Sequence, residues 1–402
     1  MKILMLADFY PPILGGMERH VQSLSSALSR RGHQVTVCTT AIQGLPQYEE
    51  QGGVKIHRLN GLFQKIPFLY KDPAKRYHPP AQDWLITRSA AQIIEREKPD
   101  IMHVHGWILY SALTLKERFG IPLVTTIHDY ALICPTKTLM NKNAICNEPL
   151  TKDCIACGRG SYGLAKSIAT YVAARTCKKE LRLVDKFIAV SSFVKEVYCK
   201  YLGLSQEDVE MIPNFYDADK EEQWEQSALA FPSDFMLFVG TVSAHKGVNI
   251  LLEAYQKFNP QTKLVLIGST HPDYRYESTE GIKVIKDAPH EVVMQAMSRC
   301  RFAVFPSIWP EPCPTVAFEA MSQSKAVIAS DIGGLKDIVL DGETGLLVPP
   351  NDSNKLAEAI SHLLERPELA AEMGERGYER FKEHYTPDVV IPRIVDVYES
   401  LV

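Results

Sequence analysis

The chain has 402 residues, of which 46% are hydrophobic, and a formal net charge of −4 at pH 7. This length and apolar content allow a sizeable core and favour two domains, while the slightly acidic balance gives no general attraction to nucleic acid. No apolar run approaches the roughly 18 residues of a membrane span, and nine cysteines suit a reducing compartment better than a disulfide scaffold. We therefore expect a cytoplasmic protein.

The N-terminal segment has the pattern of a strand, a helix and a second strand. Lys2–Ala7 and Gln34–Thr39 are apolar runs of strand length, and Met17–Arg30 between them has apolar residues at helical spacing. Such a βαβ unit predicts a parallel sheet. The connecting loop lacks the G-x-G-x-x-G dinucleotide fingerprint, but Gly15 and Gly16 would let the backbone approach a ligand where the helix begins.

Two further predicted strands lead to a histidine. Ile101–His105 and Leu123–Ile127 are apolar strands, and His128 and Asp129 follow the second one. Ligands of open parallel sheets bind at the carboxyl ends of the strands. His128 is therefore a candidate site residue, although a single histidine at such a place is more often structural.

A cluster of cysteines follows directly. Four of the nine cysteines lie within 24 residues and end in a C-x2-C pair: Cys134, Cys146, Cys154 and Cys157. Two nearby thiolates can occupy adjacent corners of a tetrahedral zinc site, and the loop has little apolar material to order it without a metal. We predict a structural zinc, with disulfides and free thiols as the alternatives. Four cysteine ligands leave no open coordination position, so this zinc would not be the catalyst.

The second half of the chain begins after an acidic segment. Residues 217–233 are weakly apolar and predict a linker, so the D-x-D spelled by Asp217-Ala218-Asp219 is assigned no metal role. Phe235–Gly240 then predicts the first strand of a second series. Lys246 lies at the start of the following helix, where its ammonium group can reach a phosphate as a point charge.

The segment Arg301–Pro350 contains the most specific pattern. Phe302–Phe305 and Ala326–Ala329 are apolar on both faces, as in buried parallel strands, and a proline-rich turn between them opens a helix. The first-turn amides of Thr315 and Val316 have no partner within the helix and lie at the positive end of its dipole. This arrangement predicts an anion site suited to phosphate.

Two glutamates flank that helix start. Glu311 and Glu319 are eight positions apart, and eight helical residues span about 12 Å, which exceeds the roughly 5 to 9.5 Å of a glycosidase pair. One carboxylate holding a sugar hydroxyl and the other a ribose diol, with a phosphate between them, fits the spacing better. For either glutamate alone, a surface charge is the favoured interpretation.

The composite segment WPEPCPTVAFEAMSQSKAVIASDIGGLKDIVLDGETGLLVPPND resembles the signature of the retaining glycosyltransferases of family 4 (group 1), and the resemblance extends over nearly the whole chain. It implies the α/β fold called GT-B, in which two Rossmann-like doubly wound parallel-sheet domains face each other across a cleft. Residues 1–216, with a C-terminal crossover helix at 386–402, would form the acceptor-side domain. Residues 217–385 would bind the nucleotide-sugar.

The resemblance also implies roles for single residues. As catalytic residues, Glu311 would bind the hydroxyls of the transferred sugar, His128 would lie beside that sugar, and Lys246 would hold the diphosphate. The donor-binding residues that it implies are Gly15, Gly16, Lys246, Cys313, Thr315, Val316 and Glu319, the last on the ribose. His105 and Asp129 are weaker candidates on the acceptor side. Thr241 occupies a position where the family usually has arginine, so that one phosphate contact is either lost or comes from His245 or another basic side chain.

The implied reaction moves a hexose from a UDP- or GDP-sugar to a glycan, glycolipid or small-molecule acceptor. Configuration would be retained without a catalytic metal, in cell-surface polysaccharide or glycoconjugate synthesis. A sugar-nucleotide epimerase, a phosphorylase that needs a pyridoxal cofactor and a non-catalytic binding subunit are the alternatives on this fold.

Two basic stretches suggest a surface partner. Asn60–Pro80 interleaves aromatic and basic residues, and Arg175–Lys186 is basic and helix-like. We hypothesise peripheral contact with the inner face of an anionic membrane and a lipid-linked acceptor. A solvated basic surface is the alternative.

Overall fold

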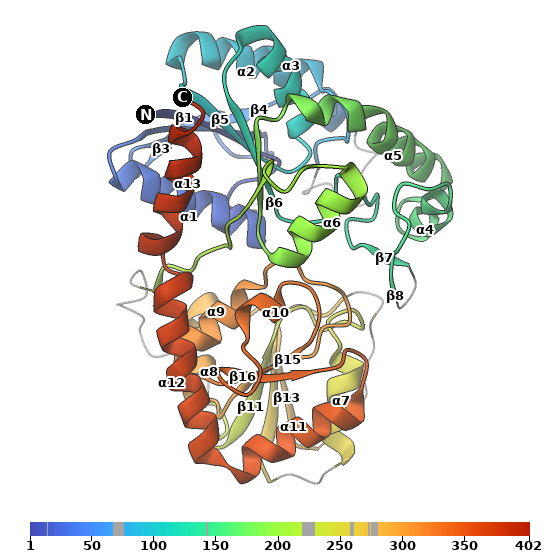
Figure 1. The fold of residues 1–402 in the computed structure, drawn as a ribbon, viewed down its shortest axis with the longest axis vertical. Coiled ribbons are helices and arrows are strands. Elements are labelled where there is room, and N and C mark those ends of the chain that lie inside the picture. The colour runs from blue at the N-terminus through green and yellow to red at the C-terminus, as the bar shows by residue number, and fades with distance from the viewer. Residues whose placement is uncertain are drawn as a thin grey trace. The chain divides into compact units, whose positions relative to one another are not determined.

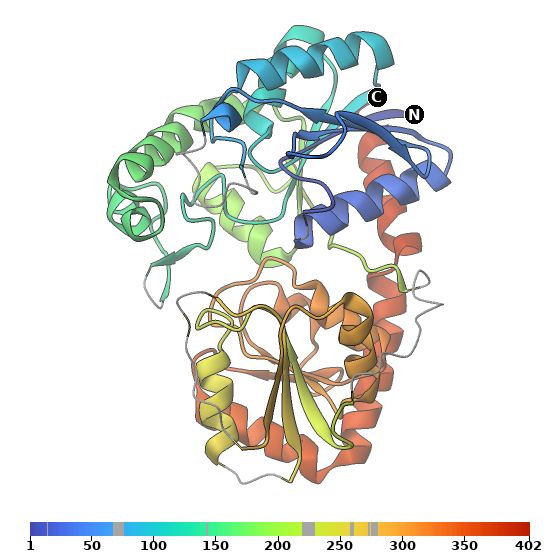
Figure 2. The same cartoon turned by 180° about the vertical axis from the view of Figure 1, so that it is seen from behind.

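The computed structural model describes residues 1–13, 15–66, 76–141, 144–218, 230–257, 261–271, 274 and 280–402. The chain divides into two compact units: an N-terminal unit of residues 1–213 and 390–402, and a C-terminal unit of residues 214–389. Each unit is an α/β domain built on one large sheet (Figures 1 and 2). The prediction of two Rossmann-like parallel-sheet domains is confirmed.

The N-terminal unit is organised around an eight-stranded sheet in the order β10-β9-β6-β5-β1-β2-β4-β3. Only the edge pair β3–β4 is antiparallel among the described pairs of this sheet. The strands are β1 (Lys2–Ala7), β2 (Gln34–Thr40), β3 (Tyr48–Gln51), β4 (Val54–Leu59), β5 (Ile101–His105), β6 (Leu123–Ile127), β9 (Lys186–Ala189) and β10 (Val209–Met211). The inner strands β1, β5 and β6 are buried along their whole length or nearly so, which explains their continuous apolar runs.

Helices cover both faces of this sheet. Helices α1 (Gly16–Arg30) and α13 (Pro387–Glu399) lie on one face, and α2 (Trp84–Glu97) and α3 (Leu109–Phe119) lie on the other (Figures 1 and 2). The Asp83 side chain begins α2 by accepting hydrogen bonds from the amides of Leu85 and Ile86, so that two donors of the first turn are satisfied. The remaining elements of the unit are η1 (Phe63–Lys65), the hairpin of β7 (Met140–Asn141) and β8 (Ala144–Ile145), α4 (Asp153–Tyr162), α5 (Leu164–Thr176), η3 (Cys177–Leu183) and α6 (Ser192–Leu202).

The C-terminal unit has a six-stranded sheet in the order β13-β12-β11-β14-β15-β16, with every described pair parallel. Its strands are β11 (Phe235–Val239), β12 (Lys263–Ile267), β13 (Ile282–Ile285), β14 (Ala303–Phe305), β15 (Val327–Ser330) and β16 (Gly345–Val348). Its helices are α7 (Val248–Lys257), α8 (His290–Arg299), α9 (Thr315–Ser322), α10 (Leu335–Ile338), α11 (Ser353–Glu365) and α12 (Pro367–His384).

The core of the C-terminal unit fills the space between this sheet and its helices. Helices α7 and α11 pack against each other and against one face, in a cluster that includes Leu251, Phe238 and Ile360. Helices α8, α9 and α12 cover the other face (Figure 1). The parallel strands are thus covered on both sides, as their apolar sequences require.

The strand orders locate the places where ligands bind in such sheets. In each unit the order reverses between the first strand and its neighbour from the second half, which are β1 and β5 in one sheet and β11 and β14 in the other. Loops that leave the carboxyl ends of the strands at such a switch point diverge and leave room for a ligand. The loops after β1, β5, β11 and β14 carry most of the site residues expected from the sequence.

Candidate active site

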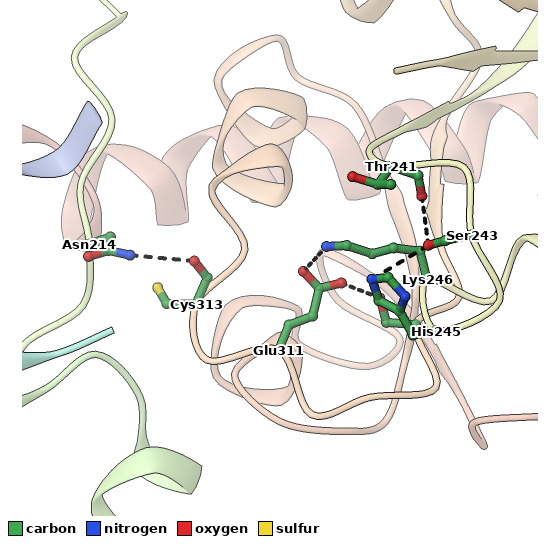
Figure 3. A network of polar contacts seen from close by, with 8 residues as sticks. Asn214, Thr241, Ser243, His245, Lys246, Glu311 and Cys313 are labelled. Atoms are coloured by element: carbon green, nitrogen blue, oxygen red, sulfur yellow. Dashed lines mark hydrogen bonds and ion pairs between the residues drawn. The ribbon is translucent and has the colours of Figure 1, made fainter. Parts of the chain in front are cut away.

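The switch point of the C-terminal unit holds a compact polar network (Figure 3). Lys246, in the loop after β11, places its Nζ 2.5 Å from Oε2 of Glu311, in the loop after β14. The Ser307 hydroxyl donates a hydrogen bond to Oε1 of the same carboxylate. The Glu311 side chain is only 8% exposed, and a carboxylate so buried needs these charged and polar partners. The structure thus brings together two of the three residues predicted to be catalytic.

Three glycines hold the two loops in place. Gly247 has φ +72°, and a Cβ there would lie 1.7 Å from the carbonyl oxygen of Pro306. Gly333 has φ +59°, and a Cβ there would meet the backbone of Glu311 at 2.6 to 2.7 Å. The Gly334 amide donates to the Glu311 carbonyl over 2.7 Å. Gly333 and Gly334 thus support the backbone of Glu311.

Helix α9 begins beside this network. Pro314 is its N-cap, and the cap makes no side-chain hydrogen bond among the described residues. Its first turn contains no acidic residue, and Thr315 and Val316 are partly exposed. The first-turn amides therefore keep the electropositive character that suits a phosphate.

Cys313 and Glu319 lie on either side of that helix start. The Cys313 carbonyl accepts a hydrogen bond from the Asn214 amide group over 3.5 Å, and burial raises the pKa of its thiol to about 12. Any contact of Cys313 with a ligand would therefore use its backbone or a neutral thiol. Glu319 is 4% exposed, and its Oε1 lies 3.9 Å from Nε2 of His290 on α8.

Thr241 occupies the position where the family that the sequence resembles usually has arginine, and His245 does not replace that positive charge. The carbonyl of Thr241 accepts a hydrogen bond from the Ser243 hydroxyl over 3.1 Å, and that hydroxyl lies 3.5 Å from Nε2 of His245 (Figure 3). Burial, and next the charge of Lys246, lower the pKa of His245. A neutral imidazole can donate one hydrogen bond to a phosphate but supplies no positive charge at pH 7.

In the N-terminal unit, the two expected glycines lie where α1 begins. Gly15 is the N-cap of α1, and a Cβ there would lie 2.4 Å from Oε2 of Glu18 in the first turn. For Gly16, no described atom lies within 4 Å of the position that a Cβ would take. The backbone is thus open at Gly16, whereas Gly15 is close to a carboxylate.

Asp8 joins the two loops at the switch point of this unit. Its buried carboxylate accepts hydrogen bonds from the amides of Trp107 and Ile108 over 3.0 and 2.7 Å, so that the loop after β1 is tied to the start of α3. Gly106, at φ +90°, makes room for the carboxylate, since a Cβ there would lie 2.7 Å from it. Burial raises the pKa of Asp8 to about 6.

His128, the third predicted catalytic residue, lies in a cluster of histidines. Its Nε2 is 3.0 Å from Nδ1 of His105, and the ring of His20 on α1 is 5.0 Å away between centroids. The ring of His103 packs 4.2 Å from that of His105, because residues two apart on a strand point to one face. Burial lowers the pKa of all four, that of His20 to about 4 and that of His103 to about 3. His128 therefore acts as a neutral hydrogen-bonding group at pH 7.

The cluster also ties the C-terminal helix to the sheet. Nδ1 of His103 lies 2.6 Å from the Tyr398 hydroxyl of α13, and its Nε2 lies 2.7 Å from the Thr126 hydroxyl. Asp129, the other acceptor-side candidate, accepts a backbone hydrogen bond from Ala131 and so shapes its own turn. These contacts favour a structural role for His103 and Asp129.

The four clustered cysteines line one cavity of about 310 Å³. All four are free thiols, and burial raises the pKa of Cys146, Cys154 and Cys157. The Cys134 Sγ lies 3.1 Å from the Thr136 hydroxyl. Among the described residues, no group of three or more His, Cys, Asp or Glu side chains is placed so that it could hold a metal ion. The predicted structural zinc is therefore not supported, because proximity in one cavity has not brought the thiols to the corners of a tetrahedron.

Several residues of these networks had no signal of their own in the sequence. Ser307 lies four residues before Glu311 in the loop after β14. His290, at the start of α8, reaches Glu319 from a separate element, and Asp8 directly follows β1 and contacts the start of α3. The roles of His290 and Asp8 therefore depend on contacts between separate segments of the chain. For Asp8, its place directly after β1 at a switch point was a usable signal. Asp219 of the D-x-D lies outside the described residues.

Comparison with known families gives matches over nearly the whole chain. The model described as "Glycosyltransferase Family 4" matches residues 14–220, which is more than half of the chain, and the model described as "Glycosyl transferases group 1" matches residues 219–380. The glycogen synthase of Mycobacterium tuberculosis is 24% identical over 99% of this chain and 94% of its own length. The phosphatidyl-myo-inositol mannosyltransferase of Mycolicibacterium smegmatis is 25% identical over 100% of this chain and 94% of its own length.

Solved structures share the fold. The sucrose-phosphate synthase of Thermosynechococcus elongatus superposes with a TM-score of 0.74 at 22% identity, over 100% of this chain and 99% of that one. The Anabaena protein HepE in complex with UDP-glucose superposes with a TM-score of 0.71 at 17% identity, over 100% of both chains. The GT-B fold expected from the sequence is thereby confirmed.

Proposed function

Because the chain belongs to the group 1 glycosyltransferases of family 4, we propose that it moves a hexose from a nucleotide diphospho-sugar to a glycan or glycolipid acceptor with retention of configuration. The observation that carries the proposal is the buried network of Lys246, Glu311 and Ser307 beside the open start of α9. This network combines a cation, a hydroxyl-binding carboxylate and helix amides, which are the groups that a sugar diphosphate needs.

The departing diphosphate would be stabilised by fixed positive charge. Lys246 offers its ammonium group, and the amides of Thr315 and Val316 offer the helix dipole. The amides of Gly15 and Gly16 would add hydrogen bonds to the same diphosphate. Groups held in place before the reaction stabilise the charge that develops in the transition state without having to reorganise.

The glutamates would position the two sugars of the donor. Glu311 would accept hydrogen bonds from the hydroxyls of the transferred hexose, with His128 as a neutral partner of the same sugar. Glu319 would bind the ribose diol. Cys313 would contact the donor through its backbone, because its thiol stays neutral.

The proposed reaction course needs no nucleophile from the protein. The bond between the anomeric carbon and the diphosphate oxygen breaks, and the acceptor oxygen forms its bond to that carbon on the same face. The proton of the acceptor hydroxyl passes to the departing diphosphate oxygen, which acts as the base. Charge on the leaving group would be balanced by Lys246 and the amides, so we propose that no catalytic metal takes part.

The donor is proposed to be a UDP- or GDP-sugar, and the acceptor a growing polysaccharide or a lipid-linked saccharide, as in cell-surface synthesis. A UDP donor is supported by the likeness to the protein HepE in complex with UDP-glucose. A lipid-linked acceptor is supported by the relative named as a phosphatidyl-myo-inositol mannosyltransferase. Peripheral membrane contact through the two basic stretches belongs to this proposal, although Phe68, Tyr70, Lys71 and Lys75 lie outside the described residues.

The test is a screen of UDP-, GDP- and ADP-hexoses, with thermal shift for binding and nucleoside diphosphate release for turnover. We expect one donor to stabilise the wild-type protein and to be consumed, and Lys246→Gln to reduce both effects. The matched control is Lys55→Gln, which removes a lysine paired with a glutamate at 2.6 Å elsewhere in the chain. The proposal fails if no donor binds, or if Lys246→Gln behaves as Lys55→Gln does.

The alternatives give different products in the same screen. A sugar-nucleotide epimerase would return the donor with an altered sugar and release no nucleoside diphosphate. A non-catalytic subunit would be stabilised by a donor without consuming it. A phosphorylase would show the absorbance of its pyridoxal cofactor.

A further inference from the structure

Helix α5 exposes a row of apolar side chains to solvent. Leu164, Ile168 and Val172 are exposed by 51%, 42% and 48%, and their spacing of four residues places them in one row along the helix. The inward face is mixed and carries Ser167, Thr170, Tyr171 and Ala174, all of them buried. Burial of the larger apolar side chains is the ordinary outcome for a helix on a globular protein. The outward row therefore lacks the cover that its composition requires.

The orientation of α5 is fixed by close packing on α4. A Cβ at Gly158 of α4 would lie 2.9 Å from the Ser167 hydroxyl, so the two helices approach where both residues are small. The same hydroxyl donates to the Gly163 carbonyl over 2.7 Å. Rotation of α5 to bury its apolar row would bring Leu164 or Ile168 against α4, where there is no room for it. The exposure of the apolar row thus follows from the packing of the helix pair.

Basic residues precede, interrupt and follow the exposed row along the chain. Between Arg159 and Arg182 the chain has six basic residues and one acidic residue, in a protein with a net charge of −4. The basic residues are Arg159, Lys166, Arg175, Lys178, Lys179 and Arg182, and all but the partly exposed Lys166 are exposed. Both views place α4 and α5 at the periphery of the N-terminal unit, away from the strands of its sheet (Figures 1 and 2).

We propose that α5 and the basic residues beside it form a docking surface for an anionic lipid bilayer. Leu164, Ile168 and Val172 would enter the boundary between headgroups and acyl chains, with the helix lying in the plane of the membrane. The basic residues would bind anionic headgroups, each adding to the attraction. No helix in the described part of the chain is long and apolar enough to cross a membrane.

The surface fits lipid better than protein. One row of three apolar side chains on a 13-residue helix is narrow compared with the roughly 1,200 to 2,000 Å² buried in a stable protein–protein interface. A second copy of this chain would bring another six basic residues against the first six, and like charges at an interface repel. A bilayer suits both the narrow apolar row and the six basic residues. Its interior accepts the apolar side chains, and its anionic surface attracts the basic ones.

The inference deepens the membrane contact of the proposed function, but its test does not depend on catalysis. Co-sedimentation is measured without donor, with vesicles of phosphatidylcholine alone and of equal parts phosphatidylcholine and phosphatidylglycerol. We expect wild-type protein to bind the anionic vesicles, and the triple variant Leu164→Ser/Ile168→Ser/Val172→Ser to bind about tenfold more weakly or worse. Lys179→Glu/Arg182→Glu should also lose binding, and high salt should weaken the wild-type protein.

The matched control is Tyr48→Ser, which removes a side chain exposed by 49% on β3 of the same unit and should bind as wild type does. A gain-of-signal variant covers the case in which the triple variant fails to fold: the fluorescence of Val172→Trp should shift to the blue on anionic vesicles, and that of Tyr48→Trp should not. Triple-variant turnover of a soluble donor should equal that of wild type, which separates this inference from the proposed reaction. Equal sedimentation of wild-type and triple-variant protein, no blue shift at Val172→Trp, or a wild-type dimer that the triple variant abolishes would overturn the proposal.

Discussion

The ion pair between Lys246 and Glu311 implies an exchange of partners when a donor binds. In the free protein the two charges neutralise each other over 2.5 Å. A diphosphate that reaches Lys246 competes with the Glu311 carboxylate for the ammonium group. The two negative groups also repel each other. Donor binding would therefore move Lys246 from Glu311 to phosphate and leave Glu311 to accept hydrogen bonds from sugar hydroxyls.

This exchange predicts opposite effects of Glu311→Gln on binding and on turnover. The amide keeps the shape and the contact with Ser307 but removes the negative charge, so nucleoside diphosphate should bind as tightly as to wild type or more tightly. The rate should fall about tenfold to a hundredfold, because a charge-assisted hydrogen bond is worth about 1.5 to 3 kcal/mol. Calorimetry with nucleoside diphosphate and steady-state kinetics measure the two effects. Glu97→Gln is the matched control, as that glutamate pairs with Lys55, and weaker binding with unchanged turnover would refute the assignment.

Glu319→Gln should show the reverse pattern. Glu319 is buried beside His290, and its proposed partner is the ribose, which does not change during the reaction. Loss of the charged acceptor should therefore weaken nucleotide binding about tenfold or more, with a smaller effect on the rate at saturating donor. Thermal unfolding of the variant checks that the fold of α9 survives. An unchanged dissociation constant would remove Glu319 from the ribose site.

At the scale of elements, Gly16 at the start of α1 can be tested for its role. A glycine there could be needed for the fold or for the close approach of a ligand. Gly16 has open space where a Cβ would be, so Gly16→Ala should leave the thermal stability unchanged. If the α1 amides contact the diphosphate, the added methyl group hinders that approach, and donor affinity should fall about tenfold. Gly203→Ala cannot serve as the control variant, because Gly203 has φ +74° and an alanine there would strain the backbone. Unchanged affinity in Gly16→Ala would mean that this loop does not meet the donor.

The buried histidines between the N-terminal sheet, α1 and α13 predict how stability depends on pH. The folded pKa of His20 is about 4 and that of His103 about 3, below the 6.5 of an unfolded chain. The unfolded state thus binds more protons, and the free energy of unfolding falls as pH drops below about 6.5. His20 and His103, if they stay neutral, each cost about 1.5 to 2 kcal/mol between pH 6.5 and 5. Asp8, raised to about 6, acts in the opposite direction over pH 6 to 4 but is one group against four.

Urea unfolding at pH 7.5, 6 and 5 measures this dependence. We expect a marked loss of stability towards pH 5, and a smaller loss in His20→Gln, which removes one of the titrating groups. The control His384→Gln removes an exposed histidine and should leave the slope unchanged. A stability that is flat from pH 7.5 to 5 would contradict the neutral state assigned to the four histidines.

The elements show why much of the fold was predictable and parts of the site were not. Apolar runs on both sides of α1 and around α9 predicted parallel strands. A strand that is buried on both faces must be apolar at nearly every position, so it appears in the sequence as a continuous apolar run. Glu311 and Lys246 followed from a motif that fixes their local turns. The contact between Ser307 and Glu311 depends on how the loop after β14 turns. The pairs His290–Glu319 and His105–His128 join separate elements, which periodicity does not encode. The thiol cluster was placed in one cavity by the fold, yet C-x2-C spacing did not ensure metal geometry.

The same limit applies to α5. Basic residues from Arg175 onward pointed to a surface partner, but the sequence analysis gave no sign that Leu164 and Ile168 face outward. Only the packing of Ser167 against Gly158 shows that they face outward. An amphipathic pattern gives the period of a helix and leaves open which side the neighbouring helix will take.

At the scale of the whole molecule, the two units divide the proposed work. The C-terminal unit carries a charged network for the leaving group and the donor's two sugars. The N-terminal unit carries neutral imidazoles, a glycine loop and the exposed helix α5. Among the described residues we assign no side chain the role of a covalent nucleophile, so the proposed reaction is a same-face displacement.

The stereochemical course of the first turnover tests that central claim most directly. An α-linked nucleotide-hexose identified in the donor screen is incubated with the protein, and the anomeric signals of the first product are followed by proton NMR before mutarotation or further reaction. Retention predicts an α-configured product, with formation slowed in Glu311→Gln and in Lys246→Gln. A β-configured first product would contradict it.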